Sequence, residues 1–523
     1  MKLISADQMR DLDRRTIEEF GTSGEELMER AGQGAADVIR RTMEQTGFIA
    51  PLVHLIAGRG NNGGDAFAVA RILKASGIAV EIWLAGPSNE LKGDALKHHS
   101  LMTAAGVTSR ELATKDAWEE AMETPGGAEF LVDGLLGIGA RGPARGPVAG
   151  AIQYINSRAA DALVLSLDIP SGLDADTGQP HGEVVHADIT VTMGLPKTGL
   201  LASSAREYVG SVEVVDIGIP WSFVEEAECD TEVELIYSTD LKGLVPRRPR
   251  DCHKGHFGRV LVIGGARGYA GAITMAARAA VRSGAGTVSA LVPRGIADIV
   301  ASNSLETMVY SAAETPAGSL STALLPEWRK HLEDFNAILV GPGLTRDPES
   351  TLLVRELIRD CLVPLVVDAD AIAVMENQPE WFSKSRTSIT LTPHPGEMAM
   401  LFGQDISEVQ KYREGMALAA AKFTGATVVL KGAGTVVAHV DHPAAVNLTG
   451  NPGMATGGTG DVLAGLLVGL IAQGIAPYNA ARAAVFLHGR AGDLAAWRKS
   501  QPGMNATDLI EELPYAFREV TLR

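Results

Sequence analysis

The chain has 523 residues, enough for two to four domains, and 46% of its side chains are apolar, which is ample for sizeable cores. Its formal charge of −17 argues against a protein that binds the phosphate backbone of nucleic acid, whereas an anionic small molecule can still bind to local backbone N–H groups. The three cysteines, Cys229, Cys252 and Cys361, form no disulfide framework and indicate a reducing compartment, so we expect a cytoplasmic protein.

The first predicted element is a helix. The start, MKLISADQMRDLDRR, is charged too early for a secretory signal. Ser5 is a candidate N-cap, and Gln8 completes a capping box. The residues expected on the apolar side of this helix are Met9, Leu12, Ile17 and Phe20.

Short apolar runs alternate with helical patterns through the first half. Most of the runs are nearly continuous in apolar residues, as expected of strands that are covered on both faces. We therefore predict an α/β domain over residues 1–225, with a doubly wound, mostly parallel sheet. The candidate strands are LVHLIA at 52, VEIWLA at 80, FLVD at 130, ALVLSLD at 162, ITVTM at 189 and VEVVDIG at 212.

Around residues 222–250 the composition changes. FVEEAECDTEVE is acidic, LVPRRPRDCHKG is basic and interrupted by proline, and neither has a strong period. We place a domain boundary near 225–240 and predict a second α/β domain over residues 235–523. Its candidate strands are RVLVIGG at 259, TVSALVP at 287, AILVGPG at 337, PLVVDAD at 364, SITLTPH at 388 and TVVLKGAGTVVAHV at 427.

The stretch GRGNNGGDAF, residues 58–67, joins a predicted strand to a predicted helix. Its glycines spell G-x-G-x-x-G, which permits close backbone approach and leaves helix-start N–H groups free for a phosphate. A plain strand-to-helix turn or an NAD-dependent dehydrogenase, with Glu81 as the ribose acid, also fits this pattern. The distinctive residues are Asn61, Asn62 and Asp65, whose side chains can hydrogen-bond a ligand or supply oxygen to a metal.

Three further stretches carry polar residues after a strand. VDGLLGIGARGP places Asp133 before a glycine-rich loop, LSLDIPSGLDADTG places Asp168 and Ser171 at a strand end, and MGLPKTGL places Lys197 after another strand. Because the carboxyl ends of strands in an open α/β sheet share one crevice, these side chains are expected to converge. Asp168 is a candidate general acid–base. The candidate oxygen ligands for a cation are Asn62, Asp133 and Ser171.

These motifs, together with SADQMRDLD, resemble the NAD(P)H-hydrate epimerase family over about the first 220 residues. The resemblance predicts glycine after the aspartate of NNGGD, and Ala66 departs from it there. The resemblance implies a Rossmann-like three-layer fold acting on NADHX and NADPHX, whose reduced ring has gained water. It implies K⁺ at Asn62, Asp133 and Ser171, and substrate contacts at Asn61, Asn62, Gly63, Gly64, Asp65, Gly137, Ile138, Gly139, Ala140, Arg141, Gly142, Pro143 and Asp168.

The chemistry agrees with these residues. If Asp168 protonates the ring hydroxyl, the nitrogen lone pair expels water, and water re-adds on the other face. A non-catalytic binding role for the first domain is the alternative.

In the second half, NPGMATGGTGDVLAGLLVGL runs from a Gly/Thr-rich loop into an apolar helix. The loop N–H groups can form an anion hole, with Asp461 at its mouth. The alternative is that Asp461 only caps a core helix. The run VLAGLLVGLIAQGIA from Val462 is too short and too glycine-broken for a membrane span, so we expect no membrane association.

Other polar residues of the second half are ambiguous alone. The glycines of KGAGT, residues 431–435, suit a hairpin turn, while Lys431 and Thr435 suit a phosphate. His394 lies between two prolines in ITLTPHPGEM. Cys252 and His256 have i,i+4 spacing but no further ligands, so a metal site is not expected there.

HKGHFGRVLVIGG, GYAGAITMAARAAVRSGAG, VGPGL, VVDADAI, LTPHPGEM, KGAGT and NPGMATGGTGDVLAG resemble the ADP- or ATP-dependent NAD(P)H-hydrate dehydratase family over about residues 235–510. The resemblance implies a ribokinase-like fold and, for a fusion of both domains, ADP as the co-substrate with Mg²⁺ on its phosphates. It places the nucleotide at Lys431, Gly432, Ala433, Gly434, Thr435 and Gly460, and the hydrated cofactor at Ala272, Gly343, His394 and Asp461.

In this interpretation Asp461 is a general base that lets the ring hydroxyl attack the terminal phosphoryl group of ADP, after which phosphate leaves. A small-molecule kinase is the alternative, because vitamin kinases share the glycine-loop–Asp feature. We also expect a homo-oligomer.

Overall fold

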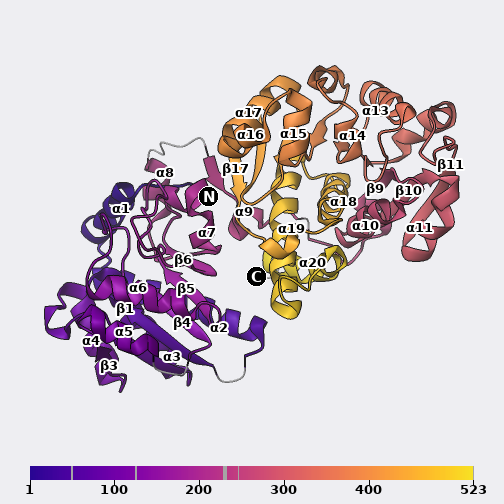
Figure 1. Cartoon of the computed structure of the whole chain (residues 1–523). Coiled ribbons are helices and arrows are strands. Elements are labelled where there is room, and N and C mark those ends of the chain that lie inside the picture. Colours follow the sequence, from indigo (N-terminus) through magenta and orange to yellow (C-terminus); the bar gives the residue numbers. More distant parts are fainter. Residues whose placement is uncertain (49–50, 124–126, 228–232, 246, 522–523) are drawn as a thin grey trace. The chain divides into compact units, whose positions relative to one another are not determined.

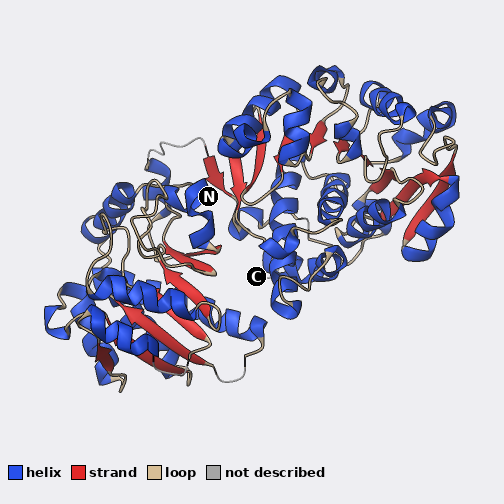
Figure 2. Ribbon diagram, viewed as in Figure 1, coloured by secondary structure: helices blue, strands red, loops and turns tan. Residues whose placement is uncertain are grey.

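The computed structural model describes residues 1–48, 51–123, 127–227, 233–245 and 247–521, and Cys229 lies outside them. The chain divides into two compact units, Met1–Thr231 and Glu232–Arg523. Figure 1 shows the first in indigo to magenta and the second in magenta to yellow. Each unit has its own central sheet with helices around it (Figure 2).

The first unit is built on a seven-stranded sheet in which every neighbouring pair is parallel. The order β3-β2-β1-β4-β5-β6-β7 reverses direction beside β1, which confirms the predicted doubly wound α/β fold. The sequence analysis missed β3, because SRE has no apolar run. The strands are β1 (Leu52–Ala57), β2 (Ala79–Leu84), β3 (Ser109–Glu111), β4 (Phe130–Gly134), β5 (Leu163–Leu167), β6 (Ile189–Met193) and β7 (Ser211–Val215).

Helices cover both faces of this sheet and make it a three-layer unit. On one face Trp118 of α5 and Tyr154 of α6 pack on strand side chains such as Trp83. On the other, α2 and α3 approach closely at Gly32, where a Cβ would lie 2.5 Å from the Ala68 Cβ. The helices are α1 (Ala6–Glu18), α2 (Gly24–Thr46), α3 (Asn61–Ala75), α4 (Gly93–Ala104), α5 (Lys115–Glu123), α6 (Pro147–Arg158), α7 (Arg206–Val209) and α8 (Trp221–Glu226).

Helix α1 begins as predicted and buries a different face. The Ser5 hydroxyl accepts a hydrogen bond from the Gln8 N–H, and the Gln8 side chain accepts one from the Ser5 N–H, so the capping box is confirmed. Met9 and Leu12 are buried, but Ile17 is 42% exposed and Phe20 is 62% exposed. The apolar assignment of these last two was wrong, because the buried stripe continues through Thr16 and the helix ends at Glu18.

The second unit has a ten-stranded mixed sheet in the order β11-β10-β9-β12-β13-β14-β15-β16-β17-β8. It is parallel from β11 to β15, then turns antiparallel through β16 and β17. The predicted strands are present, and the KGAGT turn joins β15 to β16 as a hairpin. The strands are β8 (Val233–Leu235), β9 (Arg259–Ile263), β10 (Thr287–Pro293), β11 (Thr307–Ala312), β12 (Ala337–Val340), β13 (Leu365–Val367), β14 (Ile389–Leu391), β15 (Thr427–Leu430), β16 (Thr435–His439) and β17 (His442–Asn447).

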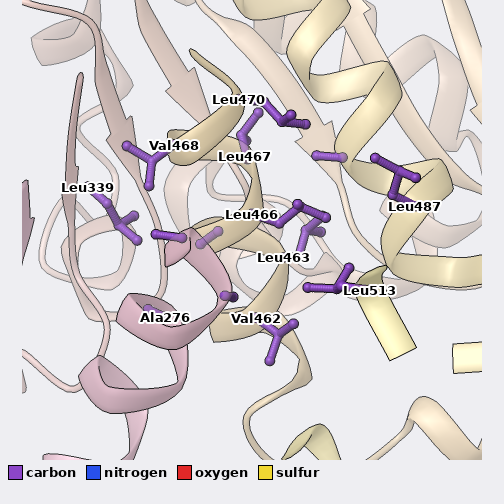
Figure 3. Close-up of a cluster of buried hydrophobic side chains, with 14 of the residues drawn as sticks. Ala276, Leu339, Val462, Leu463, Leu466, Leu467, Val468, Leu470, Leu487 and Leu513 are labelled. Atoms are coloured by element: carbon purple, nitrogen blue, oxygen red, sulfur yellow. The ribbon is translucent and has the colours of Figure 1, made fainter. Parts of the chain in front are cut away.

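Helix α18 is the centre of the second core (Figure 3). It is buried from Val462 to Ala472, and at Gly465 a Cβ would lie 2.0 Å from the Ala276 carbonyl of α10. Among the described residues, no helix has the length and apolar character to cross a bilayer. The helices are α9 (Ser238–Leu241), α10 (Ala270–Arg282), α11 (Ala297–Asn303), α12 (Leu325–Trp328), α13 (Pro348–Asp360), α14 (Asp370–Ala373), α15 (Pro395–Phe402), α16 (Ile406–Lys411), α17 (Arg413–Thr424), α18 (Thr459–Ala472), α19 (Pro477–Lys499) and α20 (Ala506–Thr521).

Candidate active sites

A cavity of about 660 Å³ lies at the carboxyl edge of the first sheet. Side chains of α1 and α2 form part of its wall, and the start of α3 and the loop after β4 complete it. Of the residues predicted to bind substrate, eight line the cavity: Asn61, Asn62, Asp65, Gly137, Ile138, Gly139, Ala140 and Asp168. The other predicted contacts, Gly63, Gly64, Arg141, Gly142 and Pro143, are not among its lining residues.

The glycines of GRGNNGGDAF let the backbone double back on itself. At Gly63 a Cβ would lie 1.9 Å from the Gly58 carbonyl oxygen, and at Gly64 it would lie 2.5 Å from the Met28 sulfur. Only glycine fits at position 63, where backbone stands in the way, whereas a side chain at position 64 would require the Met28 side chain to move. The turn therefore directs Asn61, Asn62 and the following N–H groups of α3 towards the cavity.

Asp168 follows β5 in a strained backbone conformation, with φ at +66°. Its N–H donates to the Val191 carbonyl at 2.7 Å, which fixes the turn. The Lys197 ammonium, 1% exposed, donates to the Asp168 carboxylate at 2.5 Å and to the Met193 carbonyl at 2.8 Å. The two strand-end residues thus form a buried ion pair on the cavity wall.

Two more carboxyl groups face this pair. Burial raises the pKa of Asp13 to about 6, with Lys197 opposing the shift and Asp168 adding to it. Burial also raises the pKa of Asp65 well above its usual range, and the nearby Asp168 and Asp13 charges reinforce that shift. Burial thus favours the neutral form of both Asp65 and Asp13, and the pKa of Asp13 lies well above its usual value of 3.8.

Asn62, Asp133 and Ser171 also converge, as predicted. The Ser171 hydroxyl donates to Asp133 at 2.6 Å, and the Asn62 amide donates to the Leu136 and Leu167 carbonyls at 2.9 and 3.0 Å. The Asn62 Oδ1 atom is buried and has no hydrogen-bond partner among the described residues. An orphaned amide oxygen beside a hydroxyl, a carboxylate and backbone carbonyls fits a hard cation, so the donor set is compatible with K⁺.

The second cluster lies at the carboxyl edge of β12 to β15. Asp461 occupies the first turn of α18, whose N-cap Gly458 has φ at +93°. Gly460 faces Lys431, because a Cβ there would lie 3.4 Å from the Lys431 Nζ. Burial and the Asp368 charge raise the pKa of Asp461 to about 7, against the lowering effect of Lys431. Asp461 can therefore accept a proton in the neutral range.

Lys431 is held in place by two carboxylates. Its ammonium donates to Asp368 Oδ1 at 2.7 Å and lies 3.8 Å from the nearer Glu397 oxygen. The Thr392 hydroxyl also donates to Asp368, at 2.6 Å, while Asp368 Oδ2 is buried and unpartnered in the described part of the chain. Burial raises the pKa of Glu397 to about 7. The lysine charge thus lies at the start of the KGAGT turn, between β15 and β16.

His394 is the N-cap of α15. Its Nδ1 accepts hydrogen bonds from the Gly396 and Glu397 N–H groups at 3.0 and 3.1 Å, which leaves Nε2 to carry the ring proton. Burial and the Lys431 charge lower the pKa of His394. A neutral His394 therefore presents an Nε2–H donor on a half-exposed ring.

Arg413 supports the KGAGT turn from inside. Its guanidinium, 1% exposed, donates to the Leu430, Lys431 and Gly434 carbonyls at 2.9, 3.0 and 3.3 Å. Gly432 has φ at +134°, a conformation that favours glycine. The buried Arg413 guanidinium thus fixes the turn from the side that faces the protein interior.

Ala272 and Gly343 meet at the far end of this edge. A Cβ on Gly343 would lie 2.8 Å from the Tyr269 carbonyl and 3.3 Å from the Ala272 Cβ. Glycine is required here by this approach and by its φ of +66°. The loop after β12 therefore packs directly on the start of α10.

Two family models match the chain, one for each unit. The one described as YjeF-related protein N-terminus matches residues 24–199, and the one described as NAD(P)H-hydrate dehydratase matches residues 260–515. The chain is 40% identical to the bifunctional NAD(P)H-hydrate repair enzyme Nnr of Moorella thermoacetica, over 99% of this chain and 97% of that protein. The chain belongs to the family of bifunctional NAD(P)H-hydrate repair enzymes.

A second bifunctional repair enzyme and a solved dehydratase structure are also similar to this chain. The chain is 36% identical to the bifunctional repair enzyme of Thermofilum pendens, over 99% of this chain and 96% of that protein. A solved ADP/ATP-dependent NAD(P)H-hydrate dehydratase from Bacillus subtilis, co-crystallized with ATP/Mg²⁺, is 28% identical, with a TM-score of 0.49 over 55% of this chain and 99% of that chain. Family membership confirms the resemblance and assigns the chain to the repair enzymes, not to the dehydrogenases or kinases that single motifs left open.

Several polar residues of these repair-enzyme sites were missed in the sequence. Asp13 looked like an ordinary charged position of an amphipathic helix. Asp368 directly follows a strand, and Glu397 is the N3 residue of a capping box. Both patterns were visible in the sequence, but each is also explained by an ordinary structural role. Arg413 had no local signal, because its role depends on a loop 17 or more residues away.

Proposed function

We propose that the protein epimerises the R and S forms of NADHX and NADPHX in its first unit and dehydrates the S form to NAD(P)H in its second. The dehydration consumes ADP and gives AMP and phosphate. The supporting observation is the same in both units: an acidic side chain stands near a buried lysine, Asp168 with Lys197 and Asp461 with Lys431, at the carboxyl edge of a parallel sheet.

In the first unit, Asp168 is the proposed acid–base residue. Lys197 keeps its carboxylate oriented, and the N–H groups at the start of α3 suit the pyrophosphate. Protonation of the ring hydroxyl lets water leave as the ring nitrogen supplies its lone pair, and water then adds to either face. The predicted contacts around Gly137 and Asn61 line the same cavity.

Asn62, Asp133 and Ser171 are the proposed ligands of K⁺. Bound there, the ion would supply positive charge beside the loop that carries Asp168. The residues themselves fix the loop after β5, because Asp133 accepts hydrogen bonds from the N–H and the hydroxyl of Ser171.

In the second unit, Asp461 is the proposed general base. It takes the proton of the ring hydroxyl, whose oxygen attacks the terminal phosphoryl group of ADP with release of AMP. Lys431, Gly460 and the N–H groups of the KGAGT and GGTG turns neutralise the charge that develops. Expulsion of phosphate, assisted by the ring nitrogen, leaves an iminium ion, and loss of a proton from the neighbouring ring carbon then restores the dihydropyridine, with Ala272, Gly343 and His394 around the hydrated cofactor.

Mg²⁺ is proposed as part of the nucleotide complex. In the described part of the chain no group of three or more His, Cys, Asp or Glu side chains is arranged to hold a metal. A magnesium ion bound to substrate phosphates needs no such protein cage, because it keeps several of its waters. ADP as the preferred nucleotide, a cytoplasmic location and a homo-oligomer remain predictions from the sequence.

The function is tested by incubating the protein with a mixture of R and S hydrates. With ADP and Mg²⁺ we expect full recovery of dihydropyridine absorbance and one phosphate per cofactor restored. If the first unit is inactive, absorbance recovery should slow once the S form is consumed. The R form would then be recovered only at the rate of spontaneous epimerisation. A stable phosphorylated product in place of free phosphate would identify a kinase and contradict the proposal.

A further inference from the structure

Helix α1 is fixed between two loops of the first cavity. Ile4, just before the helix, forms a parallel bridge with Lys197, in which the Ile4 N–H donates to the Pro196 carbonyl at 3.1 Å. Along the helix, the Arg10 guanidinium donates to the Ile138 carbonyl of the glycine-rich loop at 2.8 Å. The backbone of α1 is therefore positioned against both the lysine of the ion pair and the loop that lines the cavity.

Asp13 lies on the cavity side of this helix. It lines the cavity with Asp65, Asp168 and Lys197. Its Oδ1 atom is buried and has no hydrogen-bond partner among the residues that the structure describes. A buried carboxyl oxygen without a partner destabilises the fold, and no local cap or ion pair explains its presence. An oxygen of this kind, in the wall of a ligand cavity, is placed to meet a ligand.

The charges around Asp13 separate its role from that of Asp168. Lys197 donates a hydrogen bond to the Asp168 carboxylate at 2.5 Å. Lys197 acts on Asp13 only through its longer-range field, and the Asp168 charge opposes the ionisation of Asp13. The site thus holds the ion-paired carboxylate of Asp168 and two further carboxyls, Asp13 and Asp65, with no cation of the described residues in hydrogen-bond contact.

Epimerisation needs proton transfer on both faces of the ring. Water must leave from one face, with protonation of the hydroxyl, and water must add to the other face, with loss of a proton. A single carboxyl on one face assists only half of this sequence. Two carboxyls that come from different elements, a helix and a strand end, can serve a flat ring held between them.

We propose that Asp13 is a second acid–base residue of the first site, which serves the ring face opposite that of Asp168; this rests on the proposed epimerisation. With the hydroxyl on the Asp13 face, Asp13 gives its proton, the C–O bond breaks, and the ring nitrogen forms the iminium. Water then forms a C–O bond on the other face and gives a proton to Asp168. The reverse epimerisation exchanges the two roles, and solvent restores the starting protonation states.

The test follows each epimer separately in ¹⁸O-labelled water. The wild-type protein inverts both epimers and labels both. In Asp13→Asn we expect inversion to fall at least about 100-fold, a general acid–base contribution. In Asp13→Asn, the epimer whose hydroxyl faces Asp168 should still exchange that hydroxyl with labelled water, without inversion. In Asp168→Asn, only the other epimer should still exchange. A residue that merely supported the fold would lower exchange and inversion of both epimers together.

Asp11→Asn is the matched control, since Asp11 lies on the same helix with its side chain 54% exposed. The dehydratase activity of the second unit serves as the internal measure of folded protein. Undiminished inversion in Asp13→Asn, equal loss of exchange in both epimers, or epimer-selective exchange in Asp65→Asn instead, would overturn the proposal. A wild-type protein that accelerates neither inversion nor exchange would refute the proposed epimerase function itself.

Discussion

Lys197 and Asp168 form a buried ion pair across the ends of two neighbouring parallel strands, at 2.5 Å. Removing one partner of such a pair leaves an uncompensated buried charge, which costs about 3–5 kcal/mol. We therefore expect Lys197→Met to lower the free energy of unfolding by this order, and Asp168→Asn/Lys197→Met to recover part of the loss. Urea unfolding of the two single variants and the double variant measures the coupling.

The same pair gives a prediction for activity. Asparagine tolerates the left-handed conformation of Asp168 better than most non-glycine residues, so Asp168→Asn keeps the backbone while it removes the acid–base carboxylate and its ion pair with Lys197. Epimerisation is expected to fall by about 10²–10⁴-fold. Dehydration of the S hydrate, which occurs in the other unit, stays at the wild-type rate. Undiminished epimerisation in this variant would show that Asp168 is not the acid–base residue.

The pKa of Asp461 predicts the acid limb of the dehydratase pH profile. A general base must be ionised, and the pKa of Asp461 is about 7, so kcat/KM should fall as pH decreases through about 7. Asp461→Asn should lose at least about 100-fold at every pH. In Glu397→Gln the limb should move to lower pH, because the Glu397 charge is one of the causes that raise the pKa of Asp461. A limb that keeps its position in both variants would argue against Asp461 as the base.

Gly460 and Gly457 form a matched pair in the GGTG turn. A methyl group at Gly460 meets Lys431 Nζ at an ordinary 3.4 Å, and one at Gly457 meets nothing within 4 Å, so both variants should fold. Gly460→Ala occupies the mouth of the proposed anion hole, and we expect KM for ADP to rise at least about tenfold, or roughly 1.4 kcal/mol. Stability should not fall, because alanine is favoured over glycine in a helix by up to about 1 kcal/mol. Equal KM values for Gly460→Ala and Gly457→Ala would place the phosphates elsewhere.

The unpartnered oxygen of Asn62 predicts a potassium effect on stability. A ligand that binds only the folded state stabilises it by about 2.7 kcal/mol at 100 times its Kd. We expect KCl to raise the Tm of the first unit more than NaCl at equal ionic strength. Asn62→Ala should abolish this difference, and scanning calorimetry measures it. A potassium shift that survives in Asn62→Ala would exclude this residue as a ligand.

Asp13 should lower stability at alkaline pH. Its pKa is raised from 3.8 to about 6 on folding, so the ionised form is disfavoured in the folded state. The destabilisation is therefore full above pH 6, fades as pH falls through 6, and is absent below about 4. At pH 8, Asp13→Asn should gain up to about 3 kcal/mol, less where solvent screens the partly exposed side chain. The gain should vanish at pH 4 in urea titrations.

The sequence by itself determined the two α/β series, most strands of both sheets and the polar stretches at their carboxyl edges. These features are local: continuous apolar runs mark buried strands, and glycines mark turns that leave no room for a side chain, since a Cβ at Gly63 or Gly343 would lie 1.9 or 2.8 Å from a backbone oxygen. It missed the edge strands β3, β8 and β11, because an edge strand with polar or half-exposed side chains has no such run, and it missed β17, whose apolar run is only Ala444–Val446.

Only the tertiary structure decided which charges act together. Asp13 reaches the site because Ile4 pairs with Lys197, almost 200 residues away, and Lys431 is held by Asp368 from another strand. Ile17 and Phe20 were expected inside and are exposed, because the packing surface below α1 ends before them. Burial and the pairing of charges from distant segments set the pKa values of these carboxyls, and neither quantity is a property of any short stretch of sequence.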